Sequence, residues 1–552
     1  MNTPSHASGN TTRTGVILTA ARADTTICEV FGDLPTGLIP VNGKPIIFYI
    51  LEKLFAAGIR EVYIGVDHQQ DKLRRLASTF FADKLSLHFV HTSKAKGPGD
   101  SLLTIFAAIG SGPVVVNLAD TYVRQLDYSA LDDAILLSTD FVDERKWATA
   151  EVRDGQVVRF KDKQPSDVNG VYALTGVYGF ADVSLFQDFA PGNGNLEITA
   201  LLQFYQQRRG RFRAVQTCEW LDFGHIDRYY ASKNKLLHSR AFNTLEYNDT
   251  LGTITKRSRN VDKFRAEIKW QTNLPKNISV LAPRVIDYSL DDDPFIEMEF
   301  YSYPSLAEIW LFSEMNERVY FSIIDKLFTI LDLFRQNEGS VCAREYTEVY
   351  VDKTRTRLAA IDNPVLVALL ERDTVNVNGR QLAGWPRLCD TVFDLASSLY
   401  DANGNCFLHG DFCFSNILYD LRSGITRVID PRGHWGHSAY GDIKYDIAKL
   451  RHSICGDYDY VVNDLYDVRI GEVGVDYQIY SSDRSKVKCY FDRKVASAYS
   501  LSQVQLIEGL LFLSMIPLHS DCPRRQSVMF AKSMELLNLV TRGAHGGPAG
   551  EH

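Results

Sequence analysis

The chain has 552 residues, of which 45% are hydrophobic and 23% are charged, and its formal net charge is -8. This length exceeds that of one ordinary domain, so we expect several folding units of the soluble globular type. The net negative charge argues against a nucleic-acid partner, because such partners select basic surfaces.

The first residues, Met1–Thr12, are polar and lack the charged-then-apolar order of a signal peptide. The longest apolar run, Leu510–Leu518, is much shorter than the roughly 20 residues that span a bilayer. Nine cysteines form no CxxC pair and have no histidine partners at metal spacing, so neither a zinc site nor a disulfide framework is expected. These features favour a cytoplasmic protein without membrane insertion.

Residues 14 to 184 alternate short apolar runs with amphipathic stretches. The predicted elements are Gly15–Thr19, Ile46–Ala57, Glu61–Val66, Leu85–His91, Ser101–Ile109 and Pro113–Asn117. Such alternation predicts βαβ units in an α/β domain, with a Rossmann-like, mixed and mostly parallel sheet that is covered by helices on both faces. The basic cluster Arg208–Arg213 fits either an anion site or a solvated face, and in an acidic protein the solvated face is favoured.

The character of the sequence changes near residue 240. The run Phe242–Ser258 predicts a strand pair turned at Asp249–Gly252, followed by a helix over Val261–Gln271, and beyond Ser322 long amphipathic helices predominate. We therefore predict a first domain over residues 1–240, a small β-containing lobe over 241–305, a mostly helical lobe over 306–545 and a disordered tail over 546–552.

The second half carries a group of residues suited to phosphoryl transfer. Asp411 and Asn416 lie five positions apart, and Asp430 follows the apolar pair Val428-Ile429. Phosphoryl transfer needs one carboxylate to orient the attacking hydroxyl and accept its proton, and an amide and a second carboxylate to hold magnesium on the phosphates. These three residues supply that set.

A loop of the form HxDxxxxN, followed by an apolar strand and an aspartate, resembles the choline kinase and aminoglycoside phosphotransferase family, which shares the bilobal α+β protein-kinase fold. The resemblance covers about residues 242–540. It implies ATP as a substrate, Mg²⁺ as a cofactor and Asp411 as the catalytic base. It also implies Asn416 and Asp430 as magnesium ligands, and His409 as the residue that braces the catalytic loop.

The same resemblance implies roles outside this loop. The family pairs a strand lysine with the ATP phosphates and holds it with a helix glutamate, and Lys256 and Glu267 occur in that order. Such residues are also ordinary surface residues, and that alternative stays open. The run Phe295–Phe300 resembles the strand that leads to the adenine site, which places Glu299 there, while Asp446 receives a structural role beneath the catalytic loop.

The first half resembles the nucleotidyltransferases that activate sugar phosphates or phosphocholine. Those enzymes begin with a strand and a Gly-rich loop that carries an arginine, followed by a lysine before an apolar Leu-x-Pro-Val segment. Here the loop contains Ala20, Ala21 and Arg22, and the Leu38–Val41 segment follows. The resemblance implies that these loop residues bind the nucleotide.

Key cations of that family are missing. Thr25 or Thr26 stands where the family has its arginine, and Thr36 stands where it has its lysine. Both cations neutralise the triphosphate and the leaving pyrophosphate, so their loss should cost catalysis unless Arg22 substitutes.

The substrate side of the resemblance is better preserved. Asp120 ends an apolar strand and Asp222 follows later, and the family uses two such aspartates to bind magnesium. Lys163, Gly176 and Glu197 match the family's sugar-phosphate segments.

Together the two halves suggest a bifunctional enzyme. The kinase would phosphorylate an alcohol, amino alcohol or sugar, and the transferase would use CTP or UTP to make an activated precursor for surface polysaccharide. The alternative is a kinase with a non-catalytic first domain. A protein kinase is disfavoured, because no Ala-Pro-Glu follows Asp430.

The expected partners are small-molecule substrates, and a homo-oligomer is left open. Tyr445 and the run Asp457–Tyr460 would suit a cationic amine as a cation–π box, or would belong to the core or its rim.

Overall fold

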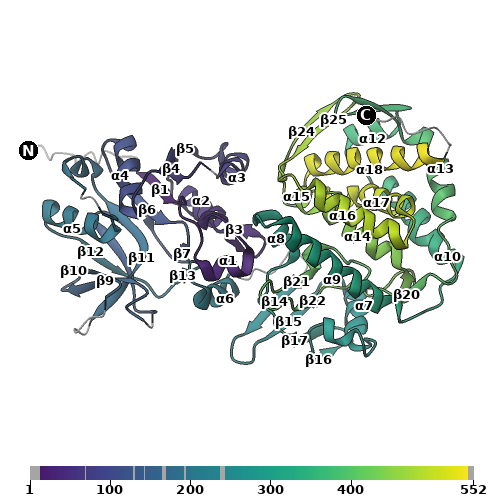
Figure 1. Ribbon diagram of the computed structural model, residues 1–552, viewed down its shortest axis with the longest axis horizontal. Helices are drawn as coiled ribbons and strands as arrows, with labels where there is room; N and C mark the ends of the chain where they lie inside the picture. Colours follow the sequence, from purple (N-terminus) through teal and green to yellow (C-terminus); the bar gives the residue numbers. More distant parts are fainter. Residues whose placement is uncertain are drawn as a thin grey trace, which may run out of the picture. The chain divides into compact units, whose positions relative to one another are not determined.

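The computed structural model describes residues 13–68, 70–128, 131–141, 143–164, 170–191, 194–236 and 243–544. The chain divides into two compact units, one of residues 1–237 and the other containing most of residues 238–552 (Figure 1). The predicted boundary at residue 240 and the predicted tail at 546–552 both lie outside the described residues.

The first unit is built on a nine-stranded sheet with the order β5-β4-β1-β6-β11-β8-β12-β10-β9. Its strands are β1 (Thr14–Leu18), β4 (Glu61–Val66), β5 (Ser86–His91), β6 (Val114–Leu118), β8 (Ala134–Ser138), β9 (Ala148–Arg153), β10 (Gln156–Asp162), β11 (Val171–Phe180) and β12 (Arg213–Gln216). The run β5-β4-β1-β6 and the pair β8–β12 are parallel, and the remaining pairs are antiparallel. The predicted α/β class with a mixed sheet is confirmed.

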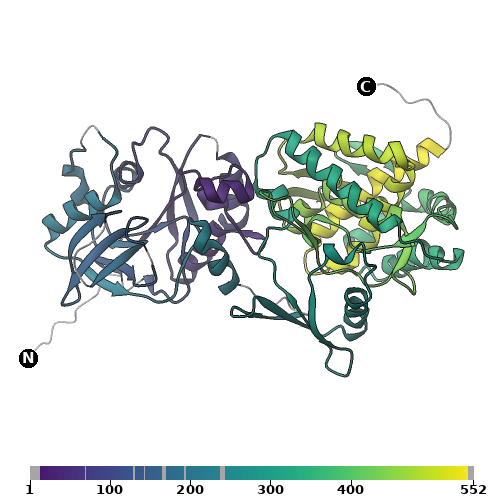
Figure 2. The ribbon, with the colours of Figure 1, turned by 60° about the horizontal axis from the view of Figure 1, so that its bottom comes forward.

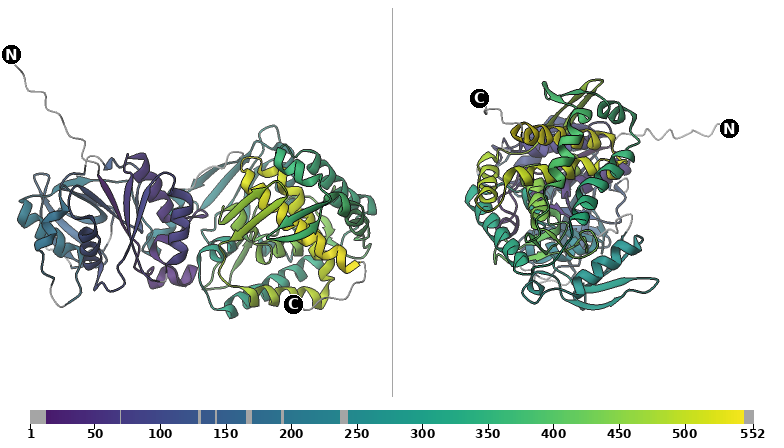
Figure 3. Two further views of the ribbon diagram at one scale, coloured as in Figure 1. Left: turned by 90° about the horizontal axis from the view of Figure 1, so that it is seen from above. Right: turned by 90° about the vertical axis from the view of Figure 1, so that its right-hand side faces the viewer.

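Helices cover both faces of this sheet (Figure 3). A Cβ atom on Gly15 would meet Leu54 of α2 (Ile46–Ala56), whereas one on Gly65 would meet Ile105 of α4 (Pro98–Ile109). Gly65 pairs with Leu18, three positions from Gly15 on the same strand, and positions that differ by an odd number face opposite sides. The two helices therefore lie on opposite faces, as the alternating pattern predicted.

A two-stranded ribbon lies beside the main sheet. In it β7 (Thr121–Val123) pairs antiparallel with β13 (Trp220–Asp222), so that Thr121 lies opposite Asp222. Because Asp120 immediately precedes β7, this pairing brings together two aspartates that are about a hundred residues apart in the chain.

The basic cluster lies at the end of α5 (Ile198–Arg209). Arg209 pairs with Asp133 at 2.8 Å and Arg208 with Asp188 at 3.4 Å, and both arginine side chains are about half exposed. This arrangement corresponds to the solvated face.

The second unit begins with a small lobe (Figure 2). Its sheet has the order β14-β15-β17-β16, with β14 (Asn243–Asn248), β15 (Thr253–Ser258), β16 (Val285–Ser289) and β17 (Phe295–Glu299). Helix α7 (Val261–Thr272) packs Phe264 and Ile268 on Ile296 and Met298 of β17. The predicted strand pair and helix are confirmed to within a few residues.

The large lobe is mainly helical. Its α-helices are α8 (Leu306–Phe312), α9 (Glu317–Arg335), α10 (Ala343–Tyr346), α11 (Lys353–Ala359), α12 (Pro364–Leu370), α13 (Trp385–Ser397), α14 (Ile443–Ile454), α15 (Tyr458–Val462), α16 (Ser485–Ala498), α17 (Leu501–Met515) and α18 (Pro523–Ala544). The lobe also contains a sheet of the order β19-β18-β25-β24, formed by Arg380–Ala383, Thr374–Val377, Gly474–Ile479 and Tyr466–Gly471. The sequence pattern did not predict this sheet, because its strands are short and rich in polar residues.

One helical stretch of the described residues, Leu501–His519, is long and apolar enough to cross a membrane by length and composition. In the structure 61% of its apolar window is buried, and α17 packs against α14 and α18. The stretch serves as a core helix of the large lobe.

Candidate functional site

The predicted catalytic loop, His409–Asn416, follows β20 (Asn405–Phe407) and is anchored by α14. The fully buried carboxylate of Asp446 accepts hydrogen bonds from the backbone N–H groups of His409, at 2.8 Å, and Gly410, at 2.9 Å. Gly410 has a φ of 74°, and a Cβ there would lie 2.9 Å from the Cβ of Arg432. This position therefore requires glycine.

The His409 ring is completely buried behind the loop. Its Nε2 lies 3.1 Å from the carbonyl oxygen of Ile429, and its Nδ1 accepts the backbone N–H of Asp411 at 3.3 Å. Because a carbonyl only accepts, the proton lies on Nε2. Burial lowers the pKa of His409 to about 4, so the ring is neutral and links the loop to the segment that carries Asp430.

Asp411 projects from the loop with its side chain 39% exposed. Asn416 donates from Nδ2 to the carbonyl oxygen and to the Oδ2 atom of Asp411, both at 3.0 Å. Lys449 of α14 lies 2.9 Å from Asp411 Oδ1. Burial alone would raise the pKa of Asp411, but the Lys449 ammonium outweighs it and holds the pKa below its usual value. The carboxylate is therefore ionised and fixed in direction.

Lys256 on β15 connects the small lobe to this loop. Its Nζ lies 2.6 Å from Glu267 of α7 and 2.8 Å from Asp430, and Lys256 and Glu267 are both buried. Burial works against the ammonium charge, but the two carboxylates raise the pKa of Lys256 and keep it protonated. Asp430 itself has a φ of 51°, in the left-handed region.

Glu299 is not brought to this cluster. It ends β17, where its carboxylate accepts the Tyr301 hydroxyl at 2.9 Å and its backbone N–H donates to Arg284 at 2.9 Å. It lines neither of the two cavities described next.

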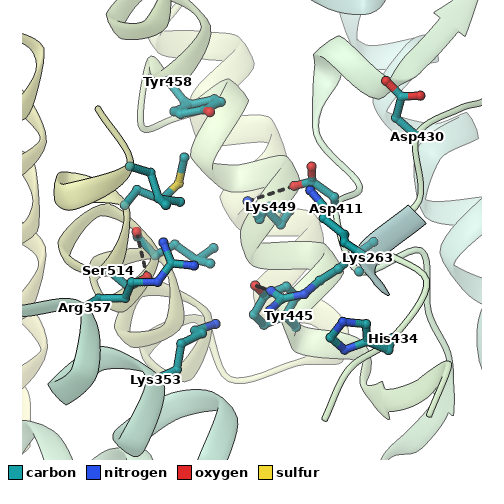
Figure 4. A pocket seen from close by; sticks show the side chains of 15 residues that line it. Lys263, Lys353, Arg357, Asp411, Asp430, His434, Tyr445, Lys449, Tyr458 and Ser514 are labelled. Carbon is teal, nitrogen blue, oxygen red and sulfur yellow. Dashed lines mark hydrogen bonds and ion pairs between the residues drawn. The ribbon is translucent and has the colours of Figure 1, made fainter. Parts of the chain in front are cut away.

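Two cavities meet at the catalytic loop. The smaller, of about 170 Å³, is lined by Lys256, Glu267 and Asn416 among others, and the larger, of about 330 Å³, by residues of α11, α14 and α17. Asp411 and Asp430 line both, so the carboxylates lie where the cavities join (Figure 4).

Sequence reasoning missed the five cations of the larger cavity, one of which is Lys263 on α7 and lines both cavities; the other four line the larger cavity alone. These four are Lys353 and Arg357 on α11, Arg432 just after Asp430, and Lys449 on α14. Two weak signals existed: Lys449 lies three positions after Asp446 on one helix, and Arg432 lies two positions after Asp430. Nothing in the sequence indicated that Lys353 and Arg357 would line a cavity.

The aromatic box, one of two alternatives for Tyr445 and the run Asp457–Tyr460, is not assembled. Of its residues only Tyr445 and Tyr458 line the cavity, while Asp457 pairs with Lys488 at 2.8 Å and Tyr460 is fully buried. Of the two alternatives that the sequence left open, the core or its rim therefore holds for the rest of the run, because α15 buries Asp457, Asp459 and Tyr460.

In the first unit Asp120 and Asp222 lie close together. A Cβ on Gly224 would lie 2.7 Å from Asp120 Oδ2, and Asp222 accepts at 3.1 Å from His225. Burial and the Asp222 carboxylate raise the pKa of Asp120 to about 6. Within the described residues no group of three or more His, Cys, Asp or Glu side chains forms a metal cage, so the site offers two carboxylates.

The loop expected to bind the triphosphate is closed on itself. Thr36 is buried and bonds to the carbonyl oxygen of Ala21 through its hydroxyl at 2.7 Å and its backbone N–H at 3.1 Å. Asp24 caps α1 (Thr25–Phe31) by accepting the backbone N–H of Thr26 at 2.9 Å. Arg22 pairs with Asp33 at 3.2 Å. Thr25 and Thr26, the positions at which the sequence comparison expected an arginine, thus begin a helix that is capped by an acidic residue.

Three other predicted residues lie apart from this loop. Lys163 follows β10 in the left-handed region, with a φ of 49°, and is exposed. Gly176 of β11 has a φ of 91° and faces Leu118. Glu197 precedes α5 and accepts from Asn195 at 2.7 Å.

Comparison with known protein families gives a separate match for each half of the chain. Residues 242–477 match the model of the phosphotransferase enzyme family, and residues 32–239 match that of the nucleotidyl transferase family.

Individual relatives match the first half. A glucose-1-phosphate thymidylyltransferase of Streptomyces griseus is 29% identical over 202 residues, which are 34% of this chain and 56% of that protein. A D-glycero-alpha-D-manno-heptose 1-phosphate guanylyltransferase of Aneurinibacillus thermoaerophilus is 22% identical over 225 residues, 38% of this chain and 93% of that protein. Among solved structures, a putative glucose-1-phosphate thymidylyltransferase from Bacillus anthracis is 21% identical, covers 41% of this chain and 98% of its own, and has a TM-score of 0.36.

Proposed function

The chain is an enzyme that joins a nucleotidyl transferase domain to a domain of the phosphotransferase enzyme family, and on this premise we propose that its second domain transfers the γ-phosphoryl group of ATP to a small-molecule hydroxyl. One observation carries the proposal: Lys256 contacts both Glu267 and Asp430, beside Asp411 and Asn416. This arrangement unites a phosphate-binding cation, a metal-binding pair and a base at the junction of two cavities. We place this domain from residue 241, with the small lobe to 305 and the large lobe to 545.

In the proposed reaction ATP lies in the smaller cavity and the acceptor alcohol in the larger one. The alcohol oxygen attacks the γ-phosphorus, the bond to the β–γ bridging oxygen breaks, and ADP leaves. Asp411 orients the hydroxyl and accepts its proton, while Lys256 neutralises phosphate charge. The carboxylate needs no strong basicity, because a hydroxyl loses its proton late in a loose transition state.

The donor set suits Mg²⁺. The amide oxygen of Asn416 and the carboxylate of Asp430 are hard oxygen ligands that both line the smaller cavity. When bound there, Mg²⁺ would neutralise charge on the phosphate oxygens. Lys256, paired with Asp430 in this structure, would share that task.

A small acceptor is favoured over a protein substrate. Only residues 431–439 separate Asp430 from β23 (Tyr440–Asp442), which leaves no length for the activation segment of protein kinases.

The test is an ATP-consumption screen over sugars, amino alcohols and hydroxy acids with the wild-type chain and Asp411→Asn. Asp411-dependent production of ADP and of a phosphorylated alcohol is expected. ATP consumption that is unchanged by Asp411→Asn would refute the assignment.

For the first domain we propose that the kinase product is joined to a nucleoside monophosphate from CTP or UTP, with release of pyrophosphate. Asp120 and Asp222 would hold Mg²⁺, since the pairing of β7 with β13 brings together two carboxylates, which are hard oxygen ligands suited to a divalent cation. Lys163, Gly176 and Glu197 would hold the phosphorylated substrate. The activated product would feed surface polysaccharide. Wild-type chain with kinase product and each nucleotide should release pyrophosphate, and Asp120→Ala should not.

A second candidate is that this domain binds its ligand without turnover. The closed loop favours it, because Thr36 is satisfied by Ala21 and Asp24 would repel a triphosphate. Calorimetry that shows nucleotide or sugar-phosphate binding without pyrophosphate release would select this candidate.

A further inference from the structure

The larger cavity of the kinase domain has a strong excess of positive charge. Its lining includes Lys263, Lys353, Arg357, Arg432 and Lys449, against only two carboxylates, Asp411 and Asp430. Both carboxylates already have cationic partners, Lys449 for Asp411 and Lys256 for Asp430. Among the described residues that line this cavity, no further carboxylate is left to compensate the remaining cations.

Three of these cations lack acidic partners. Among the described residues, no carboxylate lies within ion-pair distance of Lys353, Arg357 or Arg432. The Nη1 atom of Arg357 is buried and has no hydrogen-bond partner. Since a buried guanidinium nitrogen without a partner is costly, this atom marks a place where a ligand oxygen belongs.

The cations converge on one aromatic side chain. Arg432 donates from Nη1 to the Tyr445 hydroxyl at 2.9 Å, and Lys353 Nζ lies 5.2 Å from the Tyr445 ring centre. Lys353 and Arg357 are four positions apart on α11 and so project from one face of that helix. Figure 4 shows these two side chains on the opposite side of the cavity from Asp411 and Asp430.

The positive charge of the cluster lowers the pKa values of Lys353 and Tyr445. Burial lowers the pKa of Lys353 to about 8, and the nearby Arg432 and Lys449 contribute to that shift. Burial would raise the pKa of Tyr445, but the Lys353, Arg432 and Lys449 charges prevail and lower it to about 8. Because these like charges repel one another, an anion that binds in the cavity would stabilise their charged forms.

This cluster is separate from the cations that the nucleotide requires. Lys353, Arg357, Arg432 and Lys449 line the larger cavity and not the smaller one, where Lys256 and Asn416 lie. Only Lys263 among the cations lines both. The cluster thus lies on the acceptor's side of Asp411.

Resting on the proposed kinase function, we infer that the acceptor is an anionic alcohol whose carboxylate or phosphate group binds Lys353, Arg357 and Arg432 while its hydroxyl reaches Asp411. Arg357 and Arg432 offer planar donor pairs that match either anion. The apolar wall of Leu511 and Met515 would contact the carbon skeleton. A cationic amine such as choline would meet like charge in this cavity and is rejected.

The inference is tested by comparing acceptors that share a carbon skeleton and differ in charge. The full chain is assayed with glycerol, glycerate and glycerol 3-phosphate, with glucose, glucuronate and glucose 6-phosphate, and with choline and ethanolamine. An anionic member should exceed its neutral counterpart in kcat/KM by about 100-fold, as expected for two charge-assisted hydrogen bonds. The carboxylate and phosphate arms show which anion the cavity accepts.

Arg357→Gln and Lys353→Gln should each remove most of this preference by raising the KM of the acceptor, with the KM of ATP unchanged. Arg355→Gln on the same helix is the matched control, since Arg355 is exposed and lines neither cavity. The unchanged KM of ATP excludes misfolding as the cause.

A best acceptor that is neutral or cationic, or an undiminished preference in Arg357→Gln, would overturn the inference and leave the kinase assignment intact. Absence of any Asp411-dependent phosphorylation across the panel would overturn both.

Discussion

Replacement of Asp446 by alanine should destabilise the kinase domain and slow its reaction. The Asp446 carboxylate is fully buried and accepts two backbone N–H groups of the catalytic loop, at 2.8 and 2.9 Å. Without it both donors are buried and unsatisfied, at about 1–3 kcal/mol each, so the free energy of unfolding should fall by about 4 kcal/mol. Turnover should fall by about 100-fold, because displacement of the loop by an ångström misplaces Asp411.

The assay is urea unfolding combined with steady-state ATP turnover. Because the chain has two units, the transition to follow is the one that ATP shifts, since a ligand stabilises the domain that binds it. Asp467→Ala, an exposed aspartate on β24, is the control and should change stability by less than about 0.5 kcal/mol. An Asp446→Ala variant with the stability and turnover of the control would refute this account of the loop.

Three further outcomes follow from the same geometry. The pKa of His409 is about 4 in the folded chain against an ordinary value of 6.5. Between pH 4 and pH 6.5 the histidine is therefore protonated in the unfolded chain and neutral in the folded chain. Stability is therefore full above pH 6.5 and falls by about 3 kcal/mol towards pH 4, and His409→Gln should lose this slope in unfolding experiments across that range. Lys256→Met should lower kcat/KM for ATP by about 100- to 1,000-fold in steady-state assays, because a preorganised phosphate donor is lost. Asp120→Asn should weaken Mg²⁺ binding to the first domain in calorimetry and leave ATP-dependent phosphorylation within about twofold, because the two sites belong to separate compact units and share no residues.

These outcomes have separate controls. Lys276→Met removes an exposed lysine of the small lobe and should retain wild-type kinetics. Parallel pH–stability curves for wild type and His409→Gln, or ATP kinetics in Lys256→Met equal to those of Lys276→Met, would contradict the corresponding prediction. A kinase rate in Asp120→Asn that falls with Mg²⁺ binding would contradict the independence of the two sites.

The grouping of the predicted catalytic residues could be inferred from sequence because these residues lie within a short stretch of the chain. Asp411, Asn416 and Asp430 are connected by one loop and one hairpin, so their spacing alone carries the geometry. Lys256 and Glu267 were predicted from their order, a lysine on a strand followed by a glutamate on a helix. The small lobe confirms that strand and that helix.

The larger cavity, which we propose binds the acceptor, could not be predicted from the sequence in this way. Lys353 and Arg357 lie on α11, and Lys353 meets Tyr445 of α14 only through packing of the large lobe. A lysine and an arginine four positions apart on a helix are typical of solvated faces, so their spacing holds no information about a cavity. The choice between an aromatic box and a core cluster could not be made from sequence for the same reason, because residues adjacent in sequence, such as Asp457 and Tyr458, point to different surroundings.

In the first domain the sequence revealed which residues of the nucleotidyltransferase pattern are replaced, but not how the replacements change the structure of the loop. Thr36 and Ala21 are recognisable as departures from the nucleotidyltransferase pattern, but only the structure shows that they bond to each other. The loss of a cation can be read at a single position, whereas closure of the loop depends on a contact between two residues that are fifteen positions apart in the chain.

The most direct test of the central claim follows the γ-phosphoryl group itself. ATP labelled in the γ-phosphate is incubated with the full chain and the preferred acceptor, and the products are separated for wild type and Asp411→Asn. We predict transfer of the label to the acceptor as a phosphate ester, and a decrease in its rate of about 1,000-fold in Asp411→Asn with ATP binding retained. Label found only in inorganic phosphate, or equal transfer by the variant, would contradict the claim.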